Sequence, residues 1–582
     1  MAFAALVAEY LTRRHEPNEL HPVALLAAPF GVTAAAVAAR IAVHRMTGQA
    51  IMLAGLVIVS SAVSLWLVSR FRRPYDLDRE QLRQALDGSA HRVLGEDVLA
   101  VPASDLRPGE EIVVESGQVV PVDGTVLAGQ AMVWPWLGAK ATVASGEGDS
   151  LVAGARIQEG RLRLVVGWAG NDRAWLRLTL DPRRRADLLA VPARVGRLWA
   201  ERGAPFGAAL AALMVYAAGQ DLLAIVLVFS ASYGALAHAG IAQIGALQVV
   251  RSLLSALKRG IAYRTADAFD RAGRVSSVAF CARGTLLLGE PEVASIESLG
   301  SQNPMRVLAL VAGAQRGATD PIANAIMRAV RARNVRPDGV RSPSPQLGLG
   351  VTAVASTGET LVVGSRALML KERTSIARGE PKVSEQEAMG RTVLLVALGG
   401  HLIGLIGMQD GLRPGARAAV QYLLDVGIEP VLLSGDTRDT CETLARALDI
   451  EHIRPELLPS ECGEQVRRMA DGGATVAVVG HGTIDEAALS SADVSVALGS
   501  AGTISSEWSV NIASDDVRDA AFAIRVANRG RREARLGLTL TLAPGVIAAL
   551  AVGFNLASPA VAPVVAVLGT LAALTRFRTL EE

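Results

Sequence analysis

Long apolar runs alternate with long polar stretches along this chain. An α-helix needs ~20 predominantly apolar residues to cross a bilayer, and several runs reach or approach that length. The pattern predicts about six membrane spans in three pairs, because the last uncharged run is long enough for two helices. The candidate runs are residues 23–39, 50–69, 203–219, 222–250 and 536–575.

Basic residues give these spans a direction. If each pair forms a hairpin, with the last one turning near Asn555–Pro559, the flanking arginines and lysines lie on one side of the membrane. The positive-inside rule identifies that side as the cytoplasm. Both large polar blocks, about 72–200 and about 258–530, are therefore expected to be cytoplasmic.

The two polar blocks differ in pattern. The first alternates short apolar runs with turn residues, which is typical of a small, mostly β domain. The second has short apolar strands followed by helical patterns, which favours a parallel α/β sheet. Its strands are predicted at VSSVAF (275–280), EPVLLSG (429–435) and TVAVVG (475–480). Residues from about 292 to 400, between the first two strands, have their own turn signals and indicate an inserted subdomain.

Composition agrees with a membrane protein. Hydrophobic residues make up 51% of the chain and the mean hydropathy is +0.33, which is high for a soluble protein. A formal net charge of +2 gives no reason to expect a nucleic-acid partner. The three cysteines have no CxxC spacing, so neither a disulfide framework nor a local soft-metal motif is predicted.

Several segments, in a fixed order, resemble the heavy-metal branch of the P-type ATPases. They are DLRPGEEIVVESGQVVPVDG (105–124), KRGIAYRTADAFDRAGRVSSVAF (258–280), MQDGLRPGARAAV (408–420), LLSGDTRDTCETLARALDI (432–450) and VVGHGTIDEAALSSADVSVALG (478–499). The resemblance implies an α-helical membrane bundle, a β-rich actuator domain and a split α/β, haloacid dehalogenase-like phosphorylation domain carrying an inserted α+β nucleotide-type domain. It also implies an integral membrane protein of a bacterial inner membrane.

The resemblance also divides the chain into domains. They are a transmembrane pair (1–71), an actuator-like domain (72–200), a second transmembrane pair (201–257), the phosphorylation-like domain in two parts (258–291 and 401–530), the nucleotide-binding-like domain (292–400) and a last transmembrane pair (531–582).

The reactive residues of the family are replaced. Such a pump phosphorylates an aspartate and then hydrolyses the acyl phosphate, which requires a carboxylate nucleophile, magnesium and a lysine. The family's DKTGT matches Cys281-Ala282-Arg283-Gly284-Thr285, and the glutamate of its TGES loop matches Ala139. The lysine of LPxDK matches Cys462, and the first aspartate of GDGxND matches His481.

Other family positions are retained, among them Thr285, Asp436 and Asp485. Retained glycines and loop aspartates without reactive groups predict a catalytically inactive homologue, a pseudoenzyme. Asp320, Gly348, Gly350 and Gly364 match the family's nucleotide pocket, where Asp320 replaces a histidine and adds negative charge. Binding of Mg²⁺ and ATP is expected to be weak or lost, and turns between strands explain these glycines equally well.

Metal chemistry remains as a second hypothesis. Cys281, Cys462, His481 and Asp485 match positions around one cavity of the family, and two thiols, an imidazole and a carboxylate can bind zinc. Alternatively they are neutral replacements, with Cys281 an inert buried thiol. In the membrane, SASYGALAHAG (230–240) matches the family's CPC-type motif but has no cysteine, and His238 is interpreted as a helix-packing residue.

Three functions follow from these patterns. The preferred one is a non-catalytic membrane protein that acts as scaffold, regulator or subunit, with another membrane protein or complex as its partner. The second is a divergent ATP-driven heavy-metal transporter, which overall similarity alone would indicate. The third is a metal-binding sensor built on Cys281, Cys462 and His481.

Overall fold

The structure is a computed structural model that describes residues 48–579 apart from 180, 182–183, 301 and 501–507. The described chain forms two compact units. Unit 1 contains the residues up to Gly273 and from Val526 onward, and unit 2 contains Arg274–Ser500 and Trp508–Arg525. The predicted span at 23–39 lies outside the described residues.

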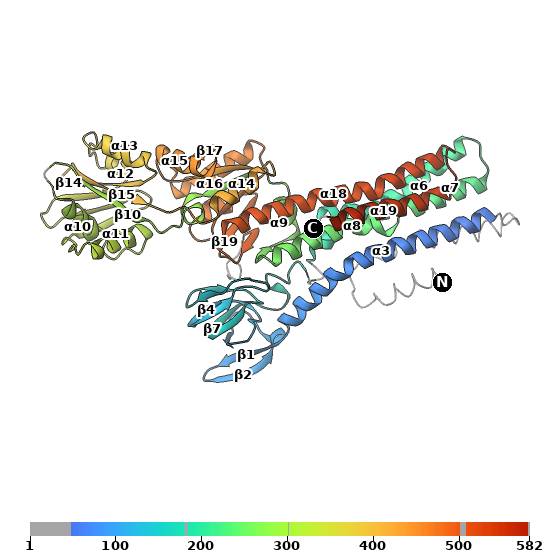
Figure 1. The fold of residues 1–582 in the computed structure, drawn as a ribbon, viewed down its shortest axis with the longest axis horizontal. Helices are drawn as coiled ribbons and strands as arrows, with labels where there is room; N and C mark the ends of the chain where they lie inside the picture. The colour runs from blue at the N-terminus through green and yellow to red at the C-terminus, as the bar shows by residue number, and fades with distance from the viewer. Residues whose placement is uncertain (1–47, 180, 182–183, 301, 501–507, 580–582) are drawn as a thin grey trace. The chain divides into compact units, whose positions relative to one another are not determined.

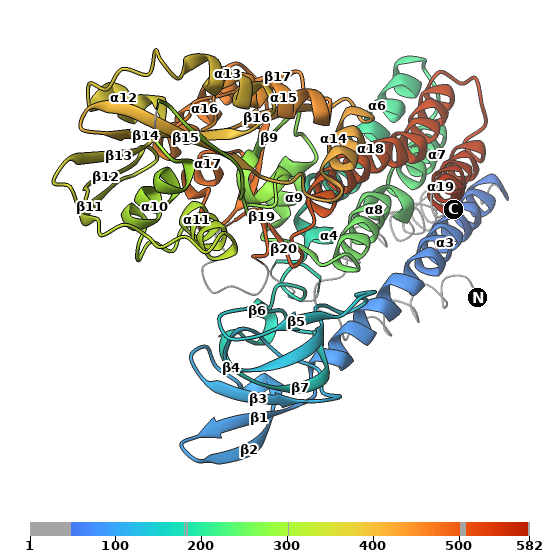
Figure 2. The same ribbon diagram turned by 60° about the vertical axis from the view of Figure 1, so that its left-hand side comes forward.

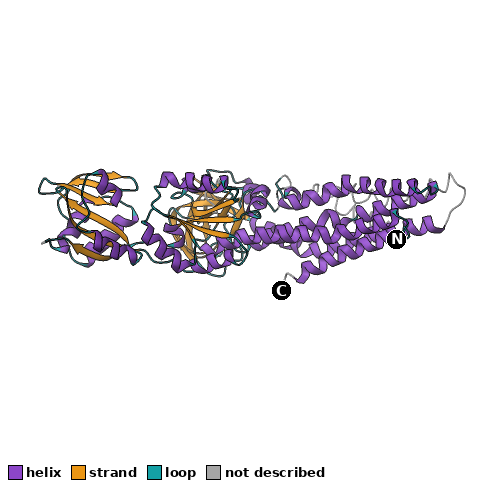
Figure 3. Ribbon diagram, turned by 90° about the horizontal axis from the view of Figure 1, so that it is seen from above, coloured by secondary structure: helices purple, strands orange, loops and turns teal. Residues whose placement is uncertain are grey.

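The apolar runs form helices, which Figure 3 shows in purple as a bundle. They are α3 (Gly48–Leu86), α6 (Ala204–Ala217), α7 (Leu222–Leu236), α8 (Ala239–Leu257), α18 (Val517–Gly553) and α19 (Val561–Thr579). The turn predicted near Asn555–Pro559 is confirmed, since it falls between the last two.

Six spans are not confirmed. Among the described residues, only three stretches are long and apolar enough to cross a membrane: Gly48–Gln84, Leu222–Leu257 and Val517–Gly553. The run predicted at 203–219 falls short because its helix α6 has only 14 residues and follows a π-helical segment at Trp199–Gly203. The apolar part of α19, Val561–Phe577, is likewise a shorter helix.

Small residues let these helices approach closely. A Cβ atom on Gly234 of α7 would lie 2.8 Å from Val57 of α3, and one on Gly545 would lie 2.9 Å from the carbonyl oxygen of Ala235. Alanines fill much of the core around them, including Ala231 and Ala566. Packing of this kind holds helices together in lipid, where the hydrophobic effect between helices is lost. In Figure 1, α6, α7, α18 and α19 run side by side.

The first polar block is a β domain, as predicted. Its strands are β1 (Ser89–Leu94), β2 (Asp97–Pro102), β3 (Glu111–Glu115), β4 (Asp123–Trp134), β5 (Val143–Ser145), β6 (Ser150–Leu151) and β7 (Arg156–Trp168). They form an antiparallel sheet in the order β2-β1-β3-β7-β4-β5, visible in Figure 2. No break in the chain's structure occurs at the predicted domain boundary at 71/72, because α3 continues across it and through Pro74 to Leu86.

Short elements continue unit 1 on either side of α6–α8. They are α4 (Ala186–Leu189), α5 (Val191–Leu198), β8 (Ile261–Tyr263) and α9 (Ala266–Ala272), the last capped by the Thr265 hydroxyl.

Unit 2 contains the predicted parallel sheet. The strands β17-β16-β9-β18-β19-β20 are adjacent in that order, and each neighbouring pair is parallel. The three predicted strands are confirmed as β9 (Ser277–Cys281), β16 (Glu429–Leu433) and β18 (Val476–His481). The remaining elements are α14 (Ala416–Leu424), α15 (Arg438–Leu448), β17 (His452–Arg454), α16 (Pro459–Asp471), α17 (Glu486–Ser490), β19 (Val494–Leu498) and β20 (Val510–Ile512).

The inserted subdomain is an antiparallel sheet in the order β10-β15-β14-β13-β12-β11. Its strands are β10 (Glu292–Ser298), β11 (Arg341–Gln346), β12 (Gly350–Val354), β13 (Thr360–Gly364), β14 (Thr392–Leu398) and β15 (His401–Gln409). Its helices are α10 (Pro304–Ala314), α11 (Pro321–Ala332), α12 (Arg366–Lys371) and α13 (Glu380–Ala388), of which α10 and α11 contribute to one apolar core with the sheet.

The subdomain extends beyond the predicted boundary at 400. Gly399 and Gly400 both have positive φ angles, 56° and 81°, and form the two-residue turn of the β14–β15 hairpin. The paired glycines therefore mark a turn inside the sheet, and β15 carries the subdomain on to Gln409.

Candidate functional site

Side chains far apart in the sequence meet at the carboxyl edge of the parallel sheet. Cys281, the last residue of β9, pairs with Leu433 of β16, and its neighbour Phe280 pairs with Val479 of β18. Because parallel strands end at the same edge, the loops after them bring Arg283, Asp436 and Asp485 together there. This edge is where α/β folds commonly place their functional groups.

Cys281 is buried, with 5% of its surface exposed. Its thiol is hydrogen bonded to the carboxylate of Asp485 and lies close enough to Cys462 for an electrostatic interaction. Burial raises the pKa of Cys281 well above its ordinary value, and Asp485 and Cys462 raise it further. The positive charge of Arg283 is paired with Asp436. The position therefore holds a protonated thiol.

Asp485 holds the loop after β18. Its Oδ2 accepts a hydrogen bond from the His481 backbone N–H at 2.8 Å. A Cβ atom on Gly480 would lie 2.6 Å from that same oxygen, so the retained glycine is required by close packing. Burial raises the pKa of Asp485. The carboxylate thus holds the loop after β18 by accepting a backbone hydrogen bond.

Arg283 and Asp436 form an ion pair, with 2.8 Å between Nη2 and Oδ1. Thr392, at the start of β14, donates to the same oxygen at 2.8 Å, and Ser434 donates to Oδ2 at 3.0 Å. Burial alone would raise the pKa of Asp436, but Arg283 and the two hydroxyls hold it below its usual value. The cluster links the phosphorylation-like domain to the inserted subdomain.

Alkylation tests the state of the thiols. Burial raises the pKa of Cys281 and Cys462, and raises that of Cys441 to about 12. Because the thiolate is the nucleophile, iodoacetamide at pH 8 is expected to label the native chain much more slowly than the chain in urea. Mass spectrometry of tryptic peptides measures each site, and partly exposed Cys462 should react first. Rapid labelling of native Cys281 would contradict the assignment.

The donor atoms at this edge do not fit Mg²⁺. The positions carry a carboxylate (Asp485), two thiols (Cys281 and Cys462) and an imidazole (His481), whereas Mg²⁺ requires oxygen ligands in octahedral geometry. For zinc, no group of three or more His, Cys, Asp or Glu side chains is placed to hold a metal anywhere in the described parts of residues 48–579. His481 instead approaches Asp515, with 4.0 Å between Nε2 and Oδ1. The zinc hypothesis therefore remains an untested prediction.

In unit 1, Ala139 lies in a tight turn, where its N–H donates to the Trp136 carbonyl at 3.1 Å. Gly138 has a φ of 93°, a conformation that favours glycine, and the Trp136 ring packs against Gly260. The loop is thus built, but the methyl group of Ala139 has no atom that can accept a proton from water.

The predicted nucleotide-pocket residues have structural roles. Asp320 caps α11 by accepting hydrogen bonds from the backbone N–H groups of Ile322 at 3.0 Å and Ala323 at 3.1 Å. Gly350 and Gly364 face each other on paired strands, where a Cβ atom on either would approach a backbone oxygen to 2.2 Å. Gly348 has a φ of 74°, in a turn. These contacts agree with the structural interpretation of the glycines.

In the membrane bundle, α7 ends at Leu236 and α8 begins at Ala239. His238, in the break, is buried, and its Nδ1 lies 3.4 Å from the Ser64 hydroxyl and 3.2 Å from the Thr570 hydroxyl. These hydroxyls come from α3 and α19, so the imidazole connects three helices. The interpretation of His238 as a helix-packing residue is consistent with these contacts.

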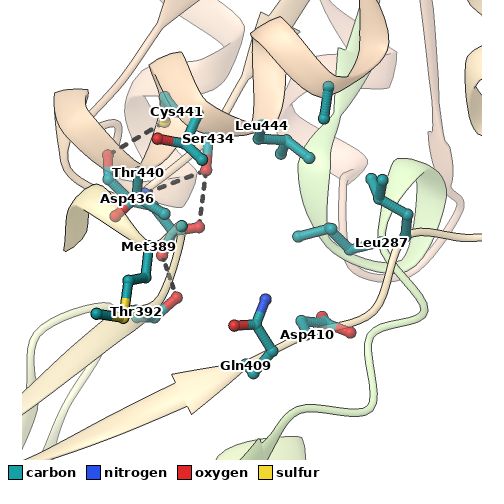
Figure 4. A pocket seen from close by; sticks show the side chains of 14 residues that line it. Leu287, Met389, Thr392, Gln409, Asp410, Ser434, Asp436, Thr440, Cys441 and Leu444 are labelled. Atoms are coloured by element: carbon teal, nitrogen blue, oxygen red, sulfur yellow. Dashed lines mark hydrogen bonds between the residues drawn. The ribbon is translucent and has the colours of Figure 1, made fainter. Parts of the chain in front are cut away.

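A cavity of about 130 Å³ lies beside the Arg283–Asp436 pair (Figure 4). Asp410, Asp436 and Thr392 line it, whereas Asp320, Gly348 and Gly364 do not. The sequence pattern identified Asp436 as a retained family position but gave no reason to expect Thr392 or Ser434 beside it. No local signal marks Thr392, because only the folding of the inserted subdomain brings it to the edge of the parallel sheet.

Two family models match this chain. The model of haloacid dehalogenase-like hydrolases matches residues 277–493, and that of the P-type ATPase actuator domain matches residues 84–179. A crystal structure of a zinc-transporting PIB-type ATPase in the E2.Pi state aligns with 98% of this chain and 97% of its own, at 21% identity and a TM-score of 0.48.

Curated relatives are named as metal exporters. A zinc-exporting P-type ATPase of Mycobacterium marinum is 29% identical over 414 residues, which cover 69% of this chain and 55% of the relative. A copper-exporting P-type ATPase B of Archaeoglobus fulgidus is 27% identical over 519 residues, covering 84% and 72%. The chain spans about half the length of the first relatives it matches. The chain is therefore similar to P-type ATPases in its actuator-like and haloacid dehalogenase-like domains, and its similarity to the metal-exporting relatives extends over most of its length.

Proposed function

We propose that this chain is a non-catalytic member of its family, which acts in the membrane as a scaffold, regulator or subunit of a membrane complex. The observation that supports this is the buried, protonated Cys281 at the end of β9, hydrogen bonded to Asp485. A carboxylate nucleophile is needed at that position for an acyl phosphate to form.

Other replaced residues of the site also argue against phosphoryl transfer. Phosphoryl transfer depends on placing positive charge and Mg²⁺ around the transferred group. Here Ala282 has no charge, and Arg283 is engaged by Asp436 and Thr392. The donor set around Asp485 also does not fit Mg²⁺. Fold alone does not decide activity, because the chemistry lies in the site.

The relatives favour a second candidate. Their names describe zinc-, copper- and manganese-exporting pumps, and they support ATP-driven metal transport better than they support inactivity. An active transporter of this sequence would need a nucleophile other than the residue at 281 and cation ligands other than cysteines in 230–240. The two candidates differ in whether a phosphorylated protein forms.

Incubation with γ-labelled ATP tests the proposal. The full chain, purified in detergent, is expected to show no acid-stable, hydroxylamine-sensitive label, whereas a catalytic relative treated in parallel does. A label on the wild-type chain would overturn the proposal in favour of transport.

Cys281→Asp is the matched variant for this test. It restores the carboxylate but leaves Ala282, Ala139 and His481 unchanged, so it too is expected to remain unlabelled. Labelling of this variant alone would show that one substitution accounts for inactivity and that the remaining machinery is intact.

Metal content and partners complete the test. A metal sensor would contain stoichiometric zinc that is lost in Cys462→Ser, measured by elemental mass spectrometry of the purified chain. Affinity purification from native membranes identifies a partner, and a scaffold or subunit is expected to co-purify with a defined membrane protein.

A further inference from the structure

One face of α18 changes its chemistry along the helix. The exposed side chains between 529 and 550 recur every three or four residues, so they form one stripe, called the α18 stripe below. Its first three members are arginines, and the others carry no charge. In chain order the stripe consists of Arg529, Arg532, Arg535, Leu536, Thr539, Leu540, Ala543, Ile547 and Leu550.

The opposite side of this segment packs inside unit 1. A Cβ atom on Gly530 would lie 2.4 Å from the hydroxyl oxygen of Ser252 in α8. Glu533 is buried and pairs with Arg576 of α19, with 3.0 Å between Oε2 and Nε. The three arginines of the stripe, in contrast, make no ion pair or side-chain hydrogen bond with any residue in the described part of the chain. Their guanidinium groups are therefore available to an external anion.

A second helix marks the level at which the stripe loses its charge. Gly196 of α5 packs toward Leu538 of α18, since a Cβ atom on the glycine would lie 3.6 Å from the leucine side chain. The outward side of α5 exposes Arg194 beside Val195 and Leu198. Basic and apolar side chains exposed together are typical of helices at the boundary between lipid headgroups and acyl chains. Leu538 lies three residues beyond the last arginine of the stripe, so α5 is at that boundary too.

The dimensions of the stripe agree with a headgroup layer. Val517–Gly553 is one of the three described stretches that are long and apolar enough to cross a membrane. At a rise of 1.5 Å per residue, Arg529 lies about 10 Å along the helix from Leu536, Arg532 about 6 Å and Arg535 about 1.5 Å. The headgroup region on each side of the hydrocarbon core is about 5–8 Å thick. Long arginine side chains extend toward it, so all three can reach the phosphates of one leaflet.

We propose that the α18 stripe binds an anionic phospholipid, with its phosphate among the three arginines and its acyl chains along the uncharged part of the stripe. Guanidinium groups bind phosphate oxygens in pairs, which favours arginine for this contact. An acidic segment of a soluble protein would fit the arginines, but it would not account for the uncharged turns that follow them on the same face. The site requires neither ATP nor a phosphorylated intermediate, so it stands or falls independently of the proposed function.

Native mass spectrometry of the full chain, released from detergent micelles, tests the site with palmitoyl-oleoyl-phosphatidylglycerol as the probe. The chain is expected to retain this lipid at concentrations at which it does not retain the matching phosphatidylcholine. Arg529→Gln/Arg532→Gln/Arg535→Gln should weaken retention at least about tenfold, because each basic residue near anionic lipid strengthens binding severalfold. The matched control, Arg306→Gln/Arg331→Gln/Arg336→Gln, removes the same charge from exposed positions of the inserted subdomain and should retain the lipid as wild type does.

A single charge reversal provides an independent variant. Arg532→Glu, in the middle of the arginines, should weaken retention more than Arg532→Gln does, while tryptophan fluorescence verifies the fold of each variant. Equal retention of phosphatidylcholine, unchanged retention by the stripe variant, or an equal loss in the control variant would each overturn the proposal. Displacement of the lipid by hexaglutamate would assign the arginines to an acidic protein segment, and displacement by glycerol phosphate would assign them to a soluble phosphate; either result would also overturn it.

Discussion

Asp187→Asn is expected to destabilise unit 1 by about 3–5 kcal/mol, the typical cost of breaking a buried charge pair. Asp187, 1% exposed, is the common partner of three buried arginines. Its Oδ2 lies 2.7 Å from Arg185, 3.1 Å from Arg79 and 3.5 Å from Arg72. Burial alone would raise the pKa of Asp187, but these arginines hold it below its ordinary range. Asparagine would leave their charges without this buried counter-ion, between α3 and α4.

Thermal unfolding of the purified chain, followed by tryptophan fluorescence, measures this effect. Asp76→Asn is the matched control, because Asp76 contacts the same Arg72 at 3.2 Å and Arg79 at 3.6 Å but is 45% exposed. Its effect should stay below about 1 kcal/mol, as for other exposed ion pairs. Equal effects of the two variants would contradict the claim that burial of Asp187 makes it important.

Arg283→Met is expected to destabilise unit 2 by about 2 kcal/mol, because it leaves the buried Asp436 carboxylate without its counter-charge. The value is below that for a fully buried pair, because the Arg283 side chain is 45% exposed and Thr392 and Ser434 remain as donors. The double variant Arg283→Met/Asp436→Asn should recover part of the loss, since no buried charge is then unpaired. A double-mutant cycle measures the coupling.

The stability of the single variant Arg283→Met is expected to depend on pH. In the wild-type chain the pKa of Asp436 lies below its usual value of 3.8. The ionised Asp436 therefore contributes its full stability at any pH above 3.8, and this contribution is lost only as the pH falls through the lowered pKa of the folded state. Without Arg283, burial should raise this pKa, so that protonation then favours the folded state. The difference in melting temperature between wild type and variant should therefore narrow from pH 7 to pH 5. A constant difference would show that Arg283 acts through packing rather than charge.

Local patterns predicted the secondary structure of unit 2 well. The short, mostly apolar runs at 275–280, 429–435 and 475–480 became β9, β16 and β18, because a strand buried on both faces favours apolar residues at most positions. The Gly399-Gly400 turn shows where the same approach fails. A glycine pair marks a turn, but whether the turn joins two strands of one sheet or two domains depends on the strands that pair across it.

Membrane spans were predicted less accurately. Hydropathy located the apolar runs, and α3 and α18 are long enough to cross a bilayer. It did not predict that α6 has 14 residues or that α7 and α8 are interrupted at His238. Helix ends depend on packing with neighbours as well as on apolar length, and the contacts of His238 with Ser64 and Thr570 come from distant helices.

The sequence by itself determined which reactive groups this protein can have: a thiol at 281, a methyl group at 139 and an imidazole at 481. The chemical groups of the side chains are set by the covalent sequence and do not depend on the fold. Only the tertiary structure decided what those groups and their neighbours contact. The Cys281 thiol binds Asp485, Arg283 turns to Asp436 and Thr392, and one oxygen of Asp410 is left without a donor. Such pairings join residues more than a hundred positions apart, and they form only when the parallel sheet and the inserted subdomain are assembled.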